Sequence, residues 1–137
     1  MSKGSQTQTD LLALAFNGTL PTWWANTHFY VALHTADPSS GAQNTNETTY
    51  RGYQRAAVAR QPSAFPVGDG RAQNAATIRF PKCADPKGEH KITHVSIGTA
   101  ATGAGQIVYA GKLSRTLKVS DLIEPQFEPQ SLGIAEV

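Results

Sequence analysis

Apolar and polar residues alternate with a period of two from about residue 28 onward. In HFYVALH (28–34), Phe29, Val31 and Leu33 share one face and the residues between them share the other, as in a β-strand. Similar patterns cover residues 53–60, 74–80, 91–98, 106–113 and 115–119, with weaker ones near Gln126-Phe127 and over 132–137. The same alternation predicts that Ile78, Phe80, Val95 and Ile97 are core residues.

Turn signals separate these segments. Pro62-Ser63, the Gly68 to Gly70 run, the Asp85 to Gly88 run and the Gly103 to Gly105 run lie between them, at roughly the 8–12-residue spacing of all-β domains. We therefore predict an all-β fold, a two-layer antiparallel β-sandwich with Greek-key or jelly-roll connections.

One short helix is predicted near the N-terminus. Asp10 can cap the run LLALAF (11–16), and Asn17-Gly18 closes it as a helix C-terminus does. This run is apolar on nearly every side, so the helix needs cover all round. The expected organisation is a flexible segment over residues 1–9 and a single β-sandwich domain over residues 10–137, because 137 residues make one domain.

The composition indicates the cellular compartment in which the protein is made. The single Cys83 cannot form an internal disulfide, and MSKGSQTQTD lacks the apolar core of a signal peptide. No apolar run approaches the ~18 residues of a membrane span. We expect a soluble protein made in a reducing cytosol, with no membrane partner.

Charge is unevenly distributed. Residues 51–118 hold eleven basic and three acidic side chains, whereas residues 120–137 hold four acidic side chains and no basic one. The bases are scattered singly through strand-like segments. A solvated face, a protein partner of opposite charge and nucleic acid are the three interpretations, and the scatter argues most against nucleic acid.

No motif for catalysis, cofactor binding or metal binding survives inspection. GTAATGAGQ (98–106) lacks the lysine and hydroxyl of a phosphate-binding loop and lies between two strands, so it is predicted to be a hairpin loop. His90 and His94 lie on one strand, ~13 Å apart if they share a face, too far for one zinc ion. No base is evident for the Cys83 thiol. The chain is predicted not to be an enzyme.

Five residues are candidates for partner contact: Trp23, Trp24, Arg51, Arg55 and Arg60. Two adjacent tryptophans do not easily face one core. Either one is buried and the other half-exposed, or at least one anchors a partner surface, where Trp is enriched.

The order of segments resembles a family of small tailed-phage virion structural proteins, often labelled tail-fibre-like. The matching segments are FYVALHTADP (29–38), Asn46-Glu47 with Tyr50, GYQRAAV (52–58), NAATIRFP (74–81), ITHVSIGTAATGAG (92–105) and YAGKL (109–113). The resemblance covers roughly residues 10 to 120. It also extends to the jelly-roll cement proteins that clamp neighbouring capsid subunits.

This resemblance implies a non-enzymatic capsid cement or decoration protein on the capsid surface of the virion. Its partners would be the major capsid protein and neighbouring copies of itself. The alternatives are a tail or fibre-attachment protein and, from another class, a carbohydrate-binding β-sandwich using Trp23 or Trp24 near Asn26. The polar loop after Asp37-Pro38, itself a turn signal, is expected to be an arm over a neighbouring subunit.

Overall fold

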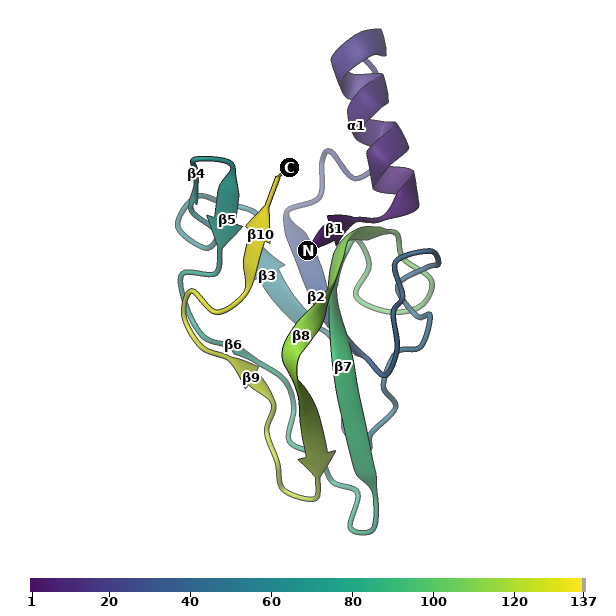
Figure 1. The fold of residues 1–137 in the computed structure, drawn as a ribbon, viewed down its shortest axis with the longest axis vertical. Coiled ribbons are helices and arrows are strands. Elements are labelled where there is room, and N and C mark those ends of the chain that lie inside the picture. Colours follow the sequence, from purple (N-terminus) through teal and green to yellow (C-terminus); the bar gives the residue numbers. More distant parts are fainter. Residues whose placement is uncertain (137) are drawn as a thin grey trace.

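A computed structural model describes residues 1–136 of the chain. It shows an all-β body of antiparallel sheets, from which one helix projects (Figure 1). The predicted fold class is thereby confirmed, with one short N-terminal helix. No described helix is long and apolar enough to cross a membrane.

The largest sheet has five strands in the order β1-β8-β7-β2-β3. These are β1 (Ser2–Lys3), β8 (Ile107–Ser120), β7 (Glu89–Gly98), β2 (His28–His34) and β3 (Ala56–Ala59). The predicted strands 106–113 and 115–119 are one continuous strand, β8, because the chain bulges near Ser114-Arg115 without turning back.

Two small sheets form the second layer. One pairs β10 (Gly133–Ala135), β5 (Arg71–Gln73) and β4 (Val67–Gly68), and the other pairs β6 (Ile78–Arg79) with β9 (Gln126–Phe127). The Gly68 to Gly70 turn is present, but its flanking strands were not predicted because each has only two or three residues. Jelly-roll connectivity stays a prediction.

The core lies between the layers. The four predicted core residues, Ile78, Phe80, Val95 and Ile97, are at most 5% exposed, which confirms them. Phe80 is stacked on Tyr53, with ring centroids 6.5 Å apart, and meets Phe127 edge-on at 6.1 Å. Aromatic and aliphatic packing of this kind supplies most of the stability of such a domain.

Helix α1 (Ser5–Asn17) begins six residues before the predicted start at Leu11. Asp10 is therefore not the N-cap; Gly4 is, without a side-chain cap hydrogen bond. The predicted end is confirmed, because Gly18 adopts the left-handed conformation (φ 66°) and its N–H bonds to the Ala13 carbonyl. Residues 1–9, expected to be a flexible segment, contain β1 and the first helical turn.

Two histidines predicted to share a face do not, because the β7–β8 pair contains a bulge. The register shifts between Ile92 and His94, so His90 and His94 face opposite sides of the sheet. His90 lies on the core side near Tyr50, with ring centroids 6.2 Å apart, whereas His94 is paired with Lys112. The alternation rule failed here because it assumes an unbroken register.

Candidate interaction surface

The base of α1 is fastened to the sheet by polar contacts. The Thr7 hydroxyl, fully buried, donates to the Ile107 carbonyl at 2.9 Å. The Asp10 carboxylate accepts from Gln106 Nε2 at 2.8 Å, from Gln6 Nε2 at 2.9 Å and from Trp23 Nε1 at 3.2 Å. Burial alone would raise the pKa of Asp10, but these three donors outweigh it and lower that pKa.

Beyond this base the helix is only partly covered, because Leu11 and Leu14 are half-buried and other apolar side chains are open to water. Thr7 is its only buried residue within the described chain. Leu12 is 60% exposed and Phe16 is 82% exposed, and Leu20 and Trp24 in the following linker are each more than half exposed. We call these four side chains the apolar N-terminal surface. The single chain thus covers only part of the apolar run and leaves Leu12 and Phe16 exposed.

This surface is also uncharged. No Lys, Arg, Asp or Glu occurs between Leu11 and Ala36. Exposed apolar surface without charge is typical of a protein contact surface and uncommon on a monomer that stays in water.

The two tryptophans have different environments. Trp23 is half-buried and packs edge-on against Phe29, with ring centroids 5.6 Å apart. Trp24 is 52% exposed and borders an open hollow that is also lined by Asn26, His28 and Gln61. Trp24 is therefore the tryptophan that a partner can reach.

The three candidate arginines also differ in their environments. Arg51 is exposed. The Arg55 side chain is buried against Glu47, and its Nη1 and Nη2 donate to the carbonyls of Ala100 and Gly103 at 2.9 and 2.6 Å. Arg60 Nη1 donates to the carbonyls of three linker residues, Trp23, Trp24 and Asn26. Arg55 and Arg60 are thus internal supports of the loops, and the partner-contact role stays a prediction.

The polar loop after β2 does not extend away as an arm. It folds back on its own sheet, where Gln43 is fully buried and its backbone N–H donates to the Gly105 carbonyl at 2.7 Å. A Cβ atom at Gly98 or Gly105 would clash with the Gln43 side chain. The glycines of the predicted hairpin loop therefore make room for this amide. The loop is therefore not an extended arm, and its contact with a neighbouring subunit stays a prediction.

A serine–histidine pair lies beneath the same loop. His34 Nε2 is 2.7 Å from Ser96 Oγ, and His34 Nδ1 is 2.8 Å from the Thr45 carbonyl oxygen. Both side chains are fully buried, so no substrate reaches the hydroxyl. A backbone carbonyl also stands where a catalytic triad has a carboxylate. The pair is a buried hydrogen bond between the large sheet and the loop that covers it.

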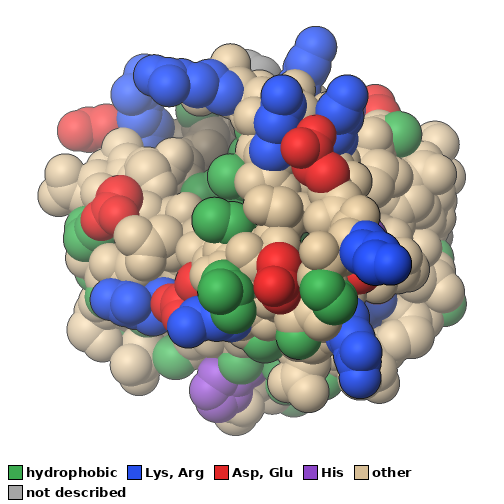
Figure 2. Space-filling model, turned by 90° about the horizontal axis from the view of Figure 1, so that it is seen from below, with side chains coloured by type: hydrophobic (Ala, Val, Ile, Leu, Met, Phe, Trp, Pro, Cys, Tyr) green, Lys and Arg blue, Asp and Glu red, His purple; other side chains and the backbone are tan. Residues whose placement is uncertain are grey.

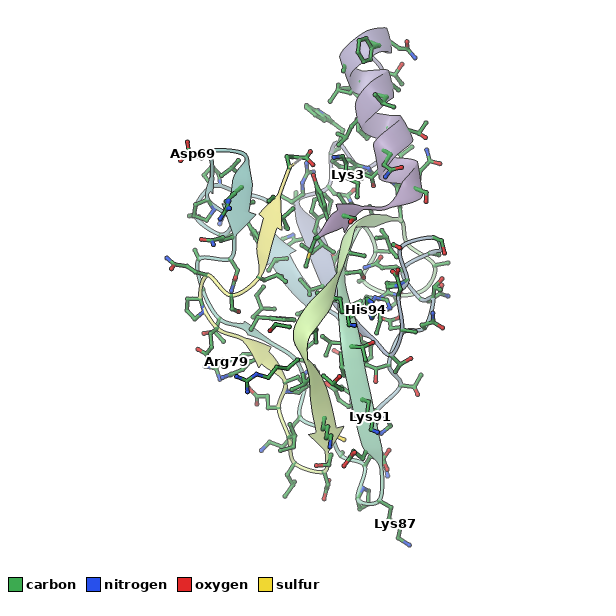
Figure 3. All side chains as sticks on the ribbon, in the orientation of Figure 1. Lys3, Asp69, Arg79, Lys87, Lys91 and His94 are labelled. Carbon is green, nitrogen blue, oxygen red and sulfur yellow. The ribbon has the colours of Figure 1, made fainter. Side chains whose placement is uncertain are left out.

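Charged residues spread over the lower end of the molecule. Figure 2 shows Lys and Arg side chains around this end, with Asp and Glu among them. On the outer face of the large sheet, Lys91 lies opposite Lys118 and His94 opposite Lys112; Figure 3 shows Lys91 and His94 along β7. None of these lysines is in an ion pair within residues 1–136.

No group of three or more His, Cys, Asp or Glu side chains among the described residues is arranged to hold a metal ion. The fold and these surfaces define the class as an all-β sandwich protein whose projecting helix carries exposed apolar side chains. The family comparison gives the particular group. Residues 3–135 match the family described as "Podophage GP4 fiber I protein gp80", and the chain belongs to this family. No curated protein matches the chain.

Proposed function

We propose that this protein is a non-enzymatic structural component of the phage tail, of the fibre or fibre-attachment type. The observation that carries the proposal is the apolar N-terminal surface on a helix whose base is fixed to the sheet. Burying it against another virion protein would remove Leu12 and Phe16 from water, which is favourable in proportion to the apolar area covered. The family description supports a fibre.

The test is to add purified protein back to particles that lack it. The double variant Leu12→Ser, Phe16→Ser should bind at least tenfold more weakly and melt like the wild type, because both side chains are exposed. Val67→Ser is the matched control: Val67 is 79% exposed on the β4–β5 hairpin and should leave binding unchanged. Binding of the wild type should survive moderate salt, which screens charges and not apolar contacts.

A capsid cement role is the second candidate function. It is favoured by the unpaired Lys91, Lys112 and Lys118 on the outer face, since a protein that clamps several subunits needs a second contact surface. Its partners would then be the major capsid protein and neighbouring copies. Imaging and counting copies in purified virions separates the two roles: hundreds of copies per particle indicate the capsid, and a handful indicate the tail.

Two results would contradict the assignment of the helix. If the double variant binds like the wild type and salt alone strips the protein from the particle, the lysine face is the attachment surface. The second result is that a glycan binds and protects the fluorescence of Trp24 from an added quencher. The hollow beside Trp24 would then be a carbohydrate-binding site.

A further inference from the structure

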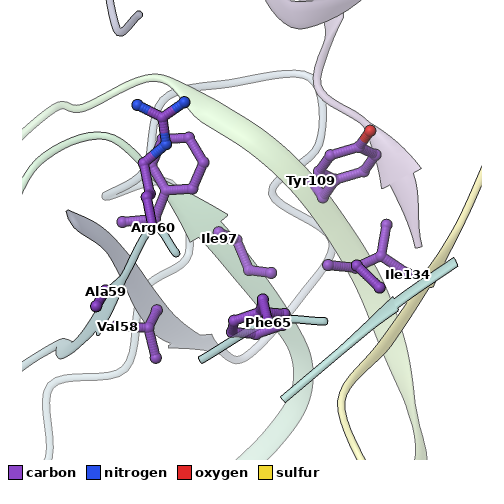
Figure 4. A pocket seen from close by; sticks show the side chains of 9 residues that line it. Val58, Ala59, Arg60, Phe65, Ile97, Tyr109 and Ile134 are labelled. Atoms are coloured by element: carbon purple, nitrogen blue, oxygen red, sulfur yellow. The ribbon is translucent and has the colours of Figure 1, made fainter. Parts of the chain in front are cut away.

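A hollow of about 170 Å³ lies between the two layers at the upper end of the sandwich (Figure 4). The large sheet contributes one wall, and the β10–β5 sheet with the loop before it contributes the other. Its apolar lining consists of Phe29, Val58, Ile97, Phe65, Ala72 and Ile134. Nothing in the proposed attachment through α1 uses this space.

The polar groups lie at the edge of the hollow. Arg60 extends over the Phe29 ring, with its Cζ atom 4.7 Å from the ring centroid. Its hydrogen bonds within residues 1–136 all come from Nη1, and it forms no ion pair there. Nε and Nη2 therefore remain as donors for an anion.

The opposite edge is formed by a phenol, that of Tyr109. Tyr109 lies there beside Glu136, and the Glu136 carboxylate is paired with Lys3 Nζ at 2.6 Å. Burial, with the charge of Glu136, raises the pKa of the Tyr109 phenol to about 12, so this group stays neutral. The hollow therefore has a charged guanidinium at one edge and a neutral phenol at the other.

We propose that the hollow binds a single aromatic ring carrying a carboxylate, with the ring between the layers and the carboxylate at Arg60. An apolar cavity of about 150 Å³ holds one benzene molecule, so the size fits one ring. The apolar walls exclude sugars and nucleotides, whose polar groups would lose their hydrogen bonds with water. The guanidinium provides a charge-assisted partner for the anion.

The experiment follows the methyl NMR signals of Val58, Ile97 and Ile134 as a probe is added. The first probe is 4-methylbenzoate, and toluene is the same ring without the charge. The third probe is a blocked Asp-Phe-Asp peptide, in which an aromatic side chain lies beside carboxylates as it could in a partner protein. We expect saturable shifts at these methyls and none at Ile92, which lies in the core near the other end of β7. At low salt 4-methylbenzoate should bind about two- to fivefold more tightly than toluene, the range of an exposed charge contact.

Variants give the matched control. Ala72→Leu fills the hollow and should weaken binding at least tenfold, whereas Ala76→Leu, at an exposed position of the same segment, should not. Val58→Phe, which enlarges another lining side chain, replaces Ala72→Leu if that variant fails to fold, and the Ile97 and Ile134 methyl signals then report binding. Binding of the peptide supports a side chain of a partner protein as the ligand, and binding of 4-methylbenzoate alone supports a free aryl acid.

Three outcomes would overturn the proposal. The first is that no probe gives saturable shifts at millimolar concentration. The second is that folded Ala72→Leu and Val58→Phe bind as the wild type does. The third is that toluene and 4-methylbenzoate bind equally at low salt, which removes the role of Arg60. Particle binding through α1 does not depend on any of them.

Discussion

Arg55 and Glu47 form a two-point ion pair inside the protein: Nε to Oε2 at 2.7 Å and Nη2 to Oε1 at 2.8 Å. The Tyr53 hydroxyl donates to the same carboxylate at 2.6 Å, and burial together with this bond raises the pKa of Tyr53. The cluster joins the loop after β2, the hairpin loop after β7 and the entry to β3. Three chain segments thus depend on one carboxylate.

Breaking this pair should destabilise the fold strongly. We expect Glu47→Gln to lower the free energy of unfolding by about 3–5 kcal/mol, because it leaves a buried guanidinium without its counter-charge. Urea denaturation measures this change. Arg51→Gln is the control, since Arg51 is exposed and should change stability by less than about 0.5 kcal/mol. Equal effects of the two variants would contradict the prediction.

Two phenylalanines test the core assignment. Phe80→Ala should cost about 3–5 kcal/mol, because Phe80 is 2% exposed and its removal leaves a cavity. Phe16→Ala should cost well under about 1 kcal/mol, because Phe16 is 82% exposed in the same chain. Thermal melting of both variants separates them. If Phe80→Ala melts like the wild type, the assignment of Phe80 to the core beside β6 is wrong.

The protein should lose stability in mild acid through His34. Burial lowers the pKa of His34 below its ordinary value of 6.5, although the Thr45 carbonyl and Glu47 act in the opposite direction. The neutral imidazole therefore stabilises the fold above pH 6.5, and this contribution is lost as the pH falls through the lowered pKa. Denaturation at a series of pH values measures the effect.

Glutamine variants isolate that contribution. His34→Gln should flatten the dependence on pH below 6.5, whereas His28→Gln, at an exposed position, should leave it unchanged. If His34→Gln loses stability in acid as the wild type does, the loss is due to protonation of carboxylates and not of His34.

Chelation should leave the melting temperature unchanged. The fold rests on apolar packing between the layers and on the hydrogen bonds of Gln43, Asp10 and Arg55, none of which needs a metal ion. Thermal melting with and without a chelator checks this, and a drop of several degrees on chelation would show a metal contribution.

The sequence predicted the long strands and the short strands β6, β9 and β10, and it missed β1, β4 and β5. Phe29, Val31 and Leu33 identify β2 because alternation persists over a whole strand, and Gly18 identifies the end of α1 because few other residues adopt its conformation. The start of α1 carries no such signal, since SQTQT has no apolar face. Thr7 is buried where its hydroxyl donates to the Ile107 carbonyl, and Ile107 is one hundred residues away in the sequence.

The candidate site was predictable only in part. The Trp23-Trp24 pair identified the linker, but the different exposure of its two members depends on Asp10 and Phe29. The loop after β2 was misjudged because its polarity suggested solvent, whereas Gln43 is buried in space left by two glycines. Arg55 looked like one more surface base because its partner, Glu47, reaches it through a tertiary contact.

Helix α1 is joined at both ends to the same sheet. Before it, β1 pairs with β8 at one edge; after it, the linker enters β2, with β7 between β8 and β2. A pulling force applied at Phe16 would therefore divide between two strands that share a neighbour, and no single flexible joint would carry it. If the protein attaches through this helix, as proposed, the load would pass into the sheet through both connections.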